Sequence, residues 1–188
     1  MQLLATEEQQ SDPMLLTPGE SLETPVVDQA TAADLEPIKV LFEEAFHINH
    51  PDGDWRKVSR ALAMELTKAV AEQKVLGGSV ILVARSQRGD FLGYIWWKYE
   101  IGPDAKQEAQ VQGMGVKKQF RSLGVGTLLA SVMGQWVHRN LSALDKPVQR
   151  VSCAVSPKNG PVLKVIEKFG MRARYVICCR DIDPLEVG

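Results

Sequence analysis

The sequence predicts a single α/β domain in which a mixed, mostly antiparallel central sheet carries helices on both faces. Three observations support this fold class. The chain has 188 residues with 45% hydrophobic content, enough for one buried core. Helical and strand periodicities follow one another in the order β-α-α-β-β-β-α-β-α-β. No apolar run is long enough to span a bilayer, which would need about 18 residues or more.

The composition limits the class of protein before any motif is considered. The chain carries 22 basic and 23 acidic residues, which gives a net charge of −1. This balance hides an asymmetry, because residues 1–24 carry five acids and no base, whereas residues 116–188 carry 12 bases and five acids. A basic C-terminal part is compatible with a phosphate-bearing partner, although solvated basic faces produce the same pattern.

The first residues differ in character from the rest of the chain. Residues 1–24 contain Pro13 and Pro18 and show little periodicity, so we predict a flexible acidic tail. No base precedes Lys39, and we therefore do not expect a secretory signal. The remaining residues, 25–188, are predicted to form one domain.

The domain is expected to begin with a short strand, residues 24–28, followed by two helices. Asp34 is placed to cap the first helix, whose apolar stripe comprises Leu35, Ile38, Leu41, Phe42 and Ala45. Residues 47–53 have turn chemistry, and Asp54 is placed to cap the second helix. Two glycines at 77–78 are expected to end that helix, whose stripe comprises Val58, Leu62, Leu66 and Ala69.

The middle of the chain reads as a three-stranded meander. Residues 80–85 and 91–99 are rich in β-branched and aromatic side chains, and residues 86–90 have the composition of a hairpin loop. Residues 110–116 form the third predicted strand, interrupted by two glycines. Glycines inside a strand indicate a bulge or a close backbone approach.

The C-terminal part alternates helix and strand. Gly124 begins a helix whose apolar residues keep helical spacing throughout: Val125, Leu128, Leu129, Val132, Met133, Trp136 and Val137. Residues 150–156 are a predicted strand, and residues 159–169 a predicted helix that stops at Gly170. Residues 174–182 are the last predicted strand.

Residues 110–127 are the strongest candidate for a functional segment. A strand with internal glycines leads through a basic loop into Gly124-Val125-Gly126 at a helix start. Unpaired N–H groups and the positive end of the helix dipole bind phosphate there. A Walker loop is excluded because no Gly-Lys-Ser/Thr follows, and a dinucleotide fingerprint would need a third glycine at Leu129. The motif that is left is Arg-x-x-Gly-x-Gly, formed by Arg121, Gly124 and Gly126.

This pattern resembles the acyl-CoA-binding segment of the GNAT family of N-acetyltransferases, whose signature is Arg/Gln-x-x-Gly-x-Gly/Ala. The predicted element order is similar to that of the family as well. The resemblance covers residues 24–182 and implies the GNAT acyl-CoA acyltransferase fold, with acetyl-CoA (coenzyme A) as the acyl donor.

The resemblance implies a set of cofactor-binding residues. Backbone groups on the third strand of the meander would pair with the pantetheine arm, and N–H groups of the loop would bind the diphosphate. An asparagine at the start of the second C-terminal helix would contact the arm. On this sequence those residues are Met114, Gly115, Val116, Arg121, Ser122, Leu123, Gly124, Val125, Gly126, Thr127 and Asn159.

The sequence departs from the family pattern at two catalytic positions. The tyrosine that would act as general acid, seven residues after Asn159, is replaced by Ile166. The carboxylate base often found on the family's fourth strand is replaced by Gln110 and Gln112, whose amides cannot take a proton. As substitutes we predict Glu100 and Glu108 as bases through water, and Tyr175 as the acid, each with a purely structural alternative.

The three cysteines, Cys153, Cys178 and Cys179, have no metal-ligand spacing, so no metal centre is expected. Their odd number favours a reduced, cytoplasmic setting. Cys153 falls on the strand beside the implied cofactor slot, but no histidine lies near it in the predicted layout. We therefore expect a buried structural cysteine rather than a nucleophile.

Two functions follow from the resemblance. The first is an N-acetyltransferase acting on a primary amine of a small molecule or peptide, by direct attack in a ternary complex. The second is a non-catalytic acyl-CoA-binding module of the same fold, which the missing tyrosine favours. We expect neither a nucleic acid nor a membrane as partner, and an exposed edge at the final strand would permit a homodimer.

Overall fold

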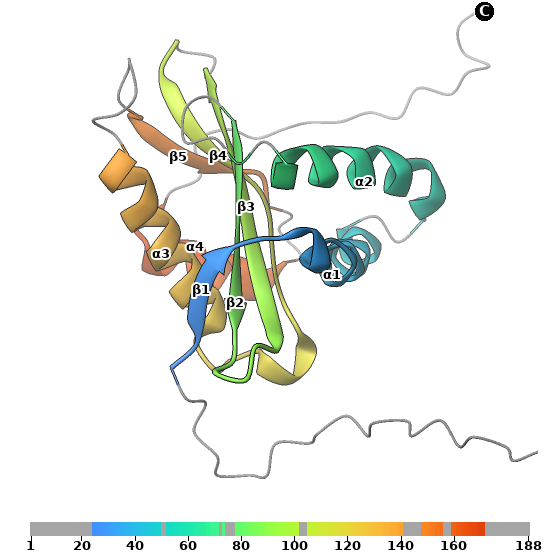
Figure 1. Ribbon diagram of the computed structural model, residues 1–188. Coiled ribbons are helices and arrows are strands. Elements are labelled where there is room, and N and C mark those ends of the chain that lie inside the picture. Colours follow the sequence, from blue (N-terminus) through green and yellow to red (C-terminus); the bar gives the residue numbers. More distant parts are fainter. Residues whose placement is uncertain are drawn as a thin grey trace, which may run out of the picture.

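The computed structural model describes residues 24–49, 52–71, 73, 78–101, 105–140, 148–155 and 159–171 (Figure 1). In chain order the elements are β1 (Val26–Gln29), a 3-10 turn η1 (Ala32–Asp34), α1 (Leu35–Asn49), α2 (Trp55–Ala71), β2 (Ser79–Arg85), β3 (Phe91–Ile101), β4 (Gln107–Val116), a second 3-10 turn η2 (Lys118–Phe120), α3 (Val125–Asn140), β5 (Arg150–Cys153) and α4 (Gly160–Lys168). This order reproduces the predicted one up to the fourth helix.

The five strands form one sheet in the order β1-β2-β3-β4-β5. The first three pairings are antiparallel, whereas β4 and β5 pair in parallel. The predicted mixed, mostly antiparallel sheet is therefore confirmed. The parallel pairing is short, from Glu108–Arg150 to Val111–Cys153, although β4 continues to Val116. The two strands part beyond Val111, and this split positions the candidate site.

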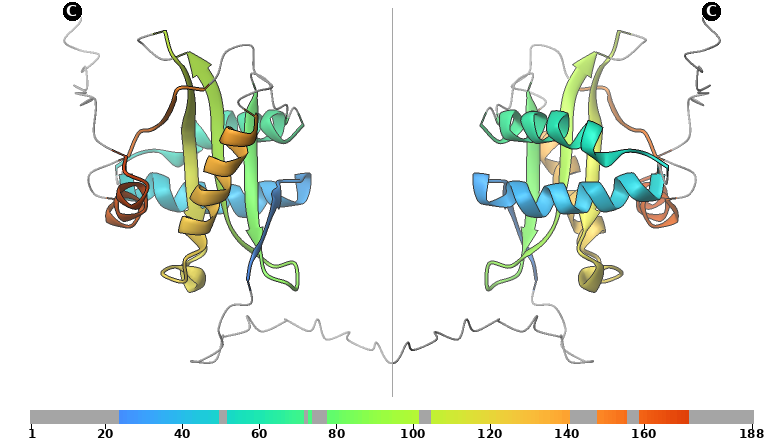
Figure 2. Two further views of the ribbon diagram at one scale, coloured as in Figure 1. Left: turned by 90° about the vertical axis from the view of Figure 1, so that its left-hand side faces the viewer. Right: turned by 90° about the vertical axis from the view of Figure 1, so that its right-hand side faces the viewer.

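Helices cover both faces of the sheet, as predicted (Figure 2). On one face α3 buries Val125, Leu129 and Met133 in a cluster with residues of β2, β3 and β4. On the other face α1 and α2 bury their apolar stripes against β2 and β3, with Ile38 and Leu66 nearly inaccessible. Burial of these side chains from both sides is the main stabilising contribution to the fold.

The first helix differs from its prediction at both ends. The Asp34 carboxylate is buried and accepts hydrogen bonds from the backbone N–H of Thr31 at 2.7 Å and from Nη2 of Arg85 at 2.6 Å. It therefore joins η1 to β2 instead of capping α1. Helix α1 also continues through His47, which was expected in a turn, because Phe46 packs on Trp55 of the next helix at 5.4 Å between ring centroids.

Other boundaries shift by a few residues. The Asp54 carboxylate accepts from the backbone N–H of Arg56 at 3.1 Å, as expected for the start of α2, but that helix ends at Ala71, before the two glycines at 77–78. Strand β4 begins three residues earlier than predicted, and β5 ends at Cys153. The stop at Gly170 is confirmed, since its φ is +67°. The predicted strand 174–182 and residues 1–23 lie outside the described residues.

Removing residues 1–24 should lower the melting temperature by less than about 4 °C. Within the described residues the contact that this deletion removes is a hydrogen bond from Nε2 of Gln87 to the carbonyl oxygen of Thr24, 2.7 Å long. A net contribution of about 1 kcal/mol is typical of such a bond. Thermal unfolding of the truncated chain, with Gln87→Ala as the control for that bond, measures the effect. A fall of about 10 °C or more would show that the predicted tail is part of the domain.

Candidate functional site

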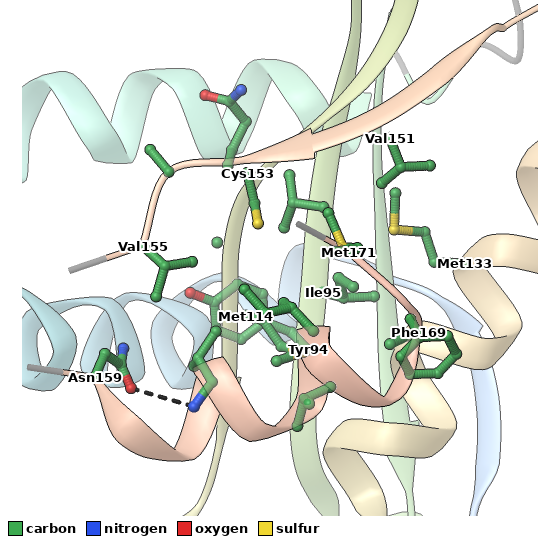
Figure 3. A pocket seen from close by; sticks show the side chains of 18 of the residues that line it. Tyr94, Ile95, Met114, Met133, Val151, Cys153, Val155, Asn159, Phe169 and Met171 are labelled. Atoms are coloured by element: carbon green, nitrogen blue, oxygen red, sulfur yellow. Dashed lines mark hydrogen bonds between the residues drawn. The ribbon is translucent and has the colours of Figure 1, made fainter. Parts of the chain in front are cut away.

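A cavity of about 330 Å³ lies where β4 and β5 part (Figure 3). Its walls come from β3, β4 and β5 and from helices α1, α3 and α4. Among the described residues that line it, the polar side chains are Tyr94, Gln112, Cys153 and Asn159. The cavity is therefore an apolar slot with a few polar groups, the usual character of a small-molecule site.

A bulge in β4 opens the slot. Trp96 of β3 pairs with Gly113, and the next residue, Trp97, pairs with Val111, so Gln112 is the extra residue. The bulge predicted from the strand glycines is thus present. Beyond it, the edge of β4 that faces β5 has no strand partner among the described residues. By the alternation of the antiparallel ladder, the backbone groups of Met114 and Val116 lie on that edge, whereas those of Gly115 face Tyr94 of β3, contrary to the prediction for Gly115. The N–H of Met114 and of Val116 and the carbonyl of Met114 can therefore pair with an extended ligand, while the carbonyl of Val116 accepts from Arg121.

Two glycines of β4 also allow aromatic side chains on the α1 face of the sheet to approach the strand backbone closely. A Cβ on Gly113 would lie 2.6 Å from Cε2 of Phe42 and 3.0 Å from the hydroxyl oxygen of Tyr94. A Cβ on Gly115 would lie 2.9 Å from Cε1 of Tyr94. The distances of 2.6 Å and 2.9 Å are shorter than those that real Cβ atoms show, so both glycines are required by the packing of aromatic rings beneath β4.

The loop between β4 and α3 has the backbone of an anion site. Ser122 and Gly124 have positive φ angles of 66° and 85°, and the first backbone bond into α3 runs from the N–H of Leu128 to the carbonyl of Gly124 at 2.9 Å. Residues 121–124 form a turn, and the well-formed backbone–backbone bonds of the described chain include none donated by the N–H groups of residues 122–127. Converging free N–H groups at a helix start bind phosphate oxygens.

Arg121 of the signature is held by protein groups. Its Nε donates to the carbonyl oxygen of Val116 at 2.9 Å, and its Nη2 donates to Oε1 of Glu44 on α1 at 2.7 Å. The side chain thus fixes the loop against the end of β4. An anion at this loop would therefore be contacted by the backbone N–H groups and by Thr127 rather than by the Arg121 side chain. The resemblance implies the same groups for the diphosphate.

Asn159 lies on the cavity wall at the start of α4 (Figure 3). Its Oδ1 accepts from the backbone N–H of Val162 at 3.4 Å, so the side chain caps the helix. The amide NH₂ has no partner among the described residues and is available to a ligand. The implied contact with the cofactor arm remains a prediction, with the residue in a position to make it.

Two of the three positions that depart from the family pattern line the slot, and Gln110 does not. Ile166 of α4 and Gln112 of β4 both line the cavity. The Nε2 of Gln112 donates to Oε1 of Gln110 at 2.7 Å, so the two amides form a pair. Neither Ile166 nor this amide pair can take or give a proton at neutral pH.

The structure does not bring the predicted carboxylate bases to the slot. Glu100 and Glu108 face each other in the β3–β4 register, and neither lines the cavity. Glu108 is buried where β4 still pairs with β5, and its Oε2 lies 3.3 Å from Nη1 of Arg150. This ion pair gives Glu108 a structural role, and Glu100 is exposed at the strand end. Tyr175 lies outside the described residues.

Sequence reasoning missed Tyr94, a residue of β3 that reaches the slot from the α1 face. It is 1% exposed and stacks on Phe42, with 6.2 Å between ring centroids. Burial raises the pKa of the Tyr94 phenol well above its usual value of about 10. An aromatic residue inside a continuous apolar strand reads as core packing. The signal that could have found it is Gly113, which leaves room for a large side chain beside the bulge.

Replacing Cys153 with alanine should change turnover by less than about fivefold. The thiol lines the cavity, and burial raises its pKa, so little thiolate is present at neutral pH. A covalent acyl-enzyme route would instead lose nearly all activity in this variant. Steady-state kinetics of Cys153→Ala decides between the two, and loss of turnover with cofactor binding intact would contradict the expected structural role.

The sequence matches no protein-family model and no curated protein. Its fold, however, matches 254 solved chains. One is a putative acetyltransferase from Pyrococcus furiosus, 22% identical with a TM-score of 0.65, covering 85% of this chain and 100% of that one. Another is AAC(6')-Iy in complex with the bisubstrate analogue CoA-S-monomethyl-acetylneamine, 19% identical with a TM-score of 0.61, covering 86% and 100%.

A third similar structure is a ribosomal-protein-alanine N-acetyltransferase from Brucella melitensis, 12% identical with a TM-score of 0.59, covering 85% of this chain and 100% of that one. Such identities establish the fold and not the activity. The class that the fold defines is therefore the mixed α/β fold of GNAT-type acetyltransferases, as the sequence predicted. No helix among the described residues is both long and apolar enough to cross a membrane.

Proposed function

We propose that this protein is a GNAT-type N-acetyltransferase that transfers an acetyl group from acetyl-CoA to a primary amine of a small molecule or peptide. One observation carries the proposal. The loop at residues 122–127, the unpaired edge of β4 and the apolar cavity follow one another along the chain, since β4 ends at Val116 and the cavity lining includes its residues 111–114. A ligand with a diphosphate, an extended amide-bearing arm and a small acyl end matches all three parts.

The described residues fit coenzyme A part by part. The loop and the positive end of α3 favour the diphosphate, whereas the charge of Arg121 is already paired with Glu44. The edge from Val116 to Met114 offers backbone groups to the amides of the arm. Asn159 offers its side-chain amide from the opposite wall. When bound, the thioester supplies an activated acyl group.

The cavity favours direct attack by an amine that arrives unprotonated. Its described lining contains no carboxylate, histidine, lysine or arginine, so it offers no strong base. Holding two reactants in line can lower a barrier by about 7–11 kcal/mol without acid–base help. The solved AAC(6')-Iy complex and a sisomicin complex of a metagenomic aminoglycoside acetyltransferase, 14% identical with a TM-score of 0.57, support a small-molecule amine as acceptor.

The test is release of free thiol from acetyl-CoA with a panel of primary amines, including peptide α-amines and small aliphatic and aromatic amines. Turnover with any of them supports the enzyme. Ile166 at the position of the family's tyrosine favours the second candidate, a non-catalytic acyl-CoA-binding module. Measurable cofactor binding with no turnover on any amine would establish that module instead. The cysteine usage supports a reducing, cytoplasmic setting for either function.

A further inference from the structure

The Tyr94 side chain is held directly beneath the bulge of β4. Its register partner on β4 is Gly115, and its ring lies where a Cβ on Gly115 would be 2.9 Å from Cε1. Its hydroxyl oxygen would be 3.0 Å from a Cβ on Gly113. The absence of both β-carbons lets the phenol lie under the strand and end at Gly113, one residue beyond the bulged Gln112.

Tyr94 is 1% exposed, and its hydroxyl makes no hydrogen bond within the described residues. An unpaired donor does not by itself mark a site, because the Tyr99 hydroxyl and the indole N–H groups of Trp96 and Trp97 are also buried without a partner. Tyr94 differs from these three because it lines the cavity (Figure 3). An unpaired donor at a cavity wall indicates a ligand atom that accepts from it.

The proposed cofactor path ends at this hydroxyl. An arm that runs from the loop along the unpaired edge of β4 passes Val116 and then Met114, and its thioester reaches the bulge at Gln112–Gly113. We propose that Tyr94 is a catalytic residue of the acetyl transfer, whose hydroxyl donates a hydrogen bond to the carbonyl oxygen of the thioester. This inference rests on the proposed function.

The hydrogen bond would strengthen as the reaction proceeds. The amine lone pair forms the new C–N bond while the carbonyl π pair moves onto oxygen, which then carries negative charge beside the Tyr94 O–H. The pair returns to re-form C=O as the C–S bond breaks, and the thiolate takes the proton that the nitrogen releases, directly or through water. Tyr94 keeps its proton throughout, so the products are an amide and a free thiol.

The burial of the phenol suits a donor rather than an acid. Because burial raises the pKa of Tyr94, the hydroxyl stays protonated across the neutral and mildly alkaline range. A donor that keeps its proton polarises the carbonyl at every pH where the amine can react. This separates Tyr94 from the missing acid at Ile166, which would have to release its proton to the thiolate.

The test compares Tyr94→Phe with the matched control Tyr99→Phe. Both residues are buried tyrosines of β3, but Tyr99 packs in the cluster on the α3 face and does not line the cavity. We expect Tyr94→Phe to lower kcat by about 10- to 100-fold, with the KM for acetyl-CoA changed less than about twofold. Tyr99→Phe should leave kcat within about twofold.

A spectroscopic readout makes the inference independent of turnover. Acetyl-CoA labelled with ¹³C at the carbonyl, bound to the wild-type protein, should show a C=O stretch at lower wavenumber than in solution. Tyr94→Phe should return the stretch toward its solution value, and Tyr99→Phe should not. An unchanged stretch in Tyr94→Phe, with the cofactor bound and the melting temperature retained, would overturn the role of Tyr94. Failure of acetyl-CoA to bind the wild-type protein would instead overturn the proposed function.

Discussion

Replacing Gly124 with valine should weaken coenzyme A binding by more than about 100-fold. Gly124 has a φ of +85°, which a β-branched residue adopts only under strain. A Cβ at this position meets no protein atom within 4 Å, so the side chain would project into open space. That space lies beside the free N–H groups of residues 122–127, where the diphosphate would bind.

The magnitude follows from the hydrogen bonds at risk. A bond from a backbone N–H to a charged phosphate contributes about 1.5–3 kcal/mol, and a shift of this loop would remove at least two of them. Since 1.4 kcal/mol corresponds to tenfold in affinity, the loss reaches about 100-fold or more. Calorimetric titration with coenzyme A measures it directly.

Gly89 supplies the matched control. It lies in the β2–β3 hairpin loop with a φ of +90°, and a Cβ there also meets nothing within 4 Å. Gly89→Val therefore carries similar backbone strain without touching the loop. It should lower stability to a similar degree and leave coenzyme A affinity unchanged. Equal coenzyme A affinities in the two variants would contradict a diphosphate site at this loop. Pantetheine lacks the diphosphate, so a loss of pantetheine affinity in Gly124→Val that Gly89→Val does not show would contradict it as well.

The parts of the molecule that the sequence predicted are those encoded locally. The unbroken helical spacing of apolar residues predicts the helix that starts after Gly124. The glycines of the strand predict the bulge at Gln112. The basic loop and the start of α3 are adjacent in the sequence. The loop that leads into this helix could therefore be predicted from a short stretch of sequence. The start of a helix at Asn159 is likewise predicted from a short window, whereas the cap that its Oδ1 provides to the N–H of Val162 is not part of that prediction.

The parts that could not be predicted depend on partners distant in sequence. Glu108 reads as a possible base until Arg150, 42 residues later, is seen to pair with it. Asp34 reads as a helix cap until Arg85, 51 residues later, takes its carboxylate. In both cases the side chain has the right chemistry for the predicted role, and the fold gives it a different partner. Tyr94 is the converse, a core-like residue that the split of the sheet brings to a cavity.

If the protein acetylates amines, it should prefer those of low pKa by about tenfold or more at pH 7. A lysine-like amine with a pKa near 10.4 costs about 4.6 kcal/mol to deprotonate at pH 7, and an α-amine near 7.8 costs about 1 kcal/mol. The free-base fractions therefore differ by a few hundredfold, of which the weaker nucleophilicity of the α-amine takes back about tenfold or somewhat more. No base among the described lining residues takes this proton, so the unprotonated fraction in solution sets the rate.

The pH dependence tests this reasoning with the sign fixed in advance. For an alkylamine, kcat/KM should rise about tenfold per pH unit from pH 6 to 9, because the free-base fraction rises by that factor. For an α-amine the rise should level off above about pH 8. The raised pKa of Tyr94 means that its donor is not lost over this range, so neither profile should fall at the alkaline end.

Matched acceptors with the same carbon skeleton and the amine at the α or the terminal carbon provide the comparison. A level profile for the alkylamine would show that a base takes its proton after binding, and the acceptor preference would then be set by shape rather than by pKa.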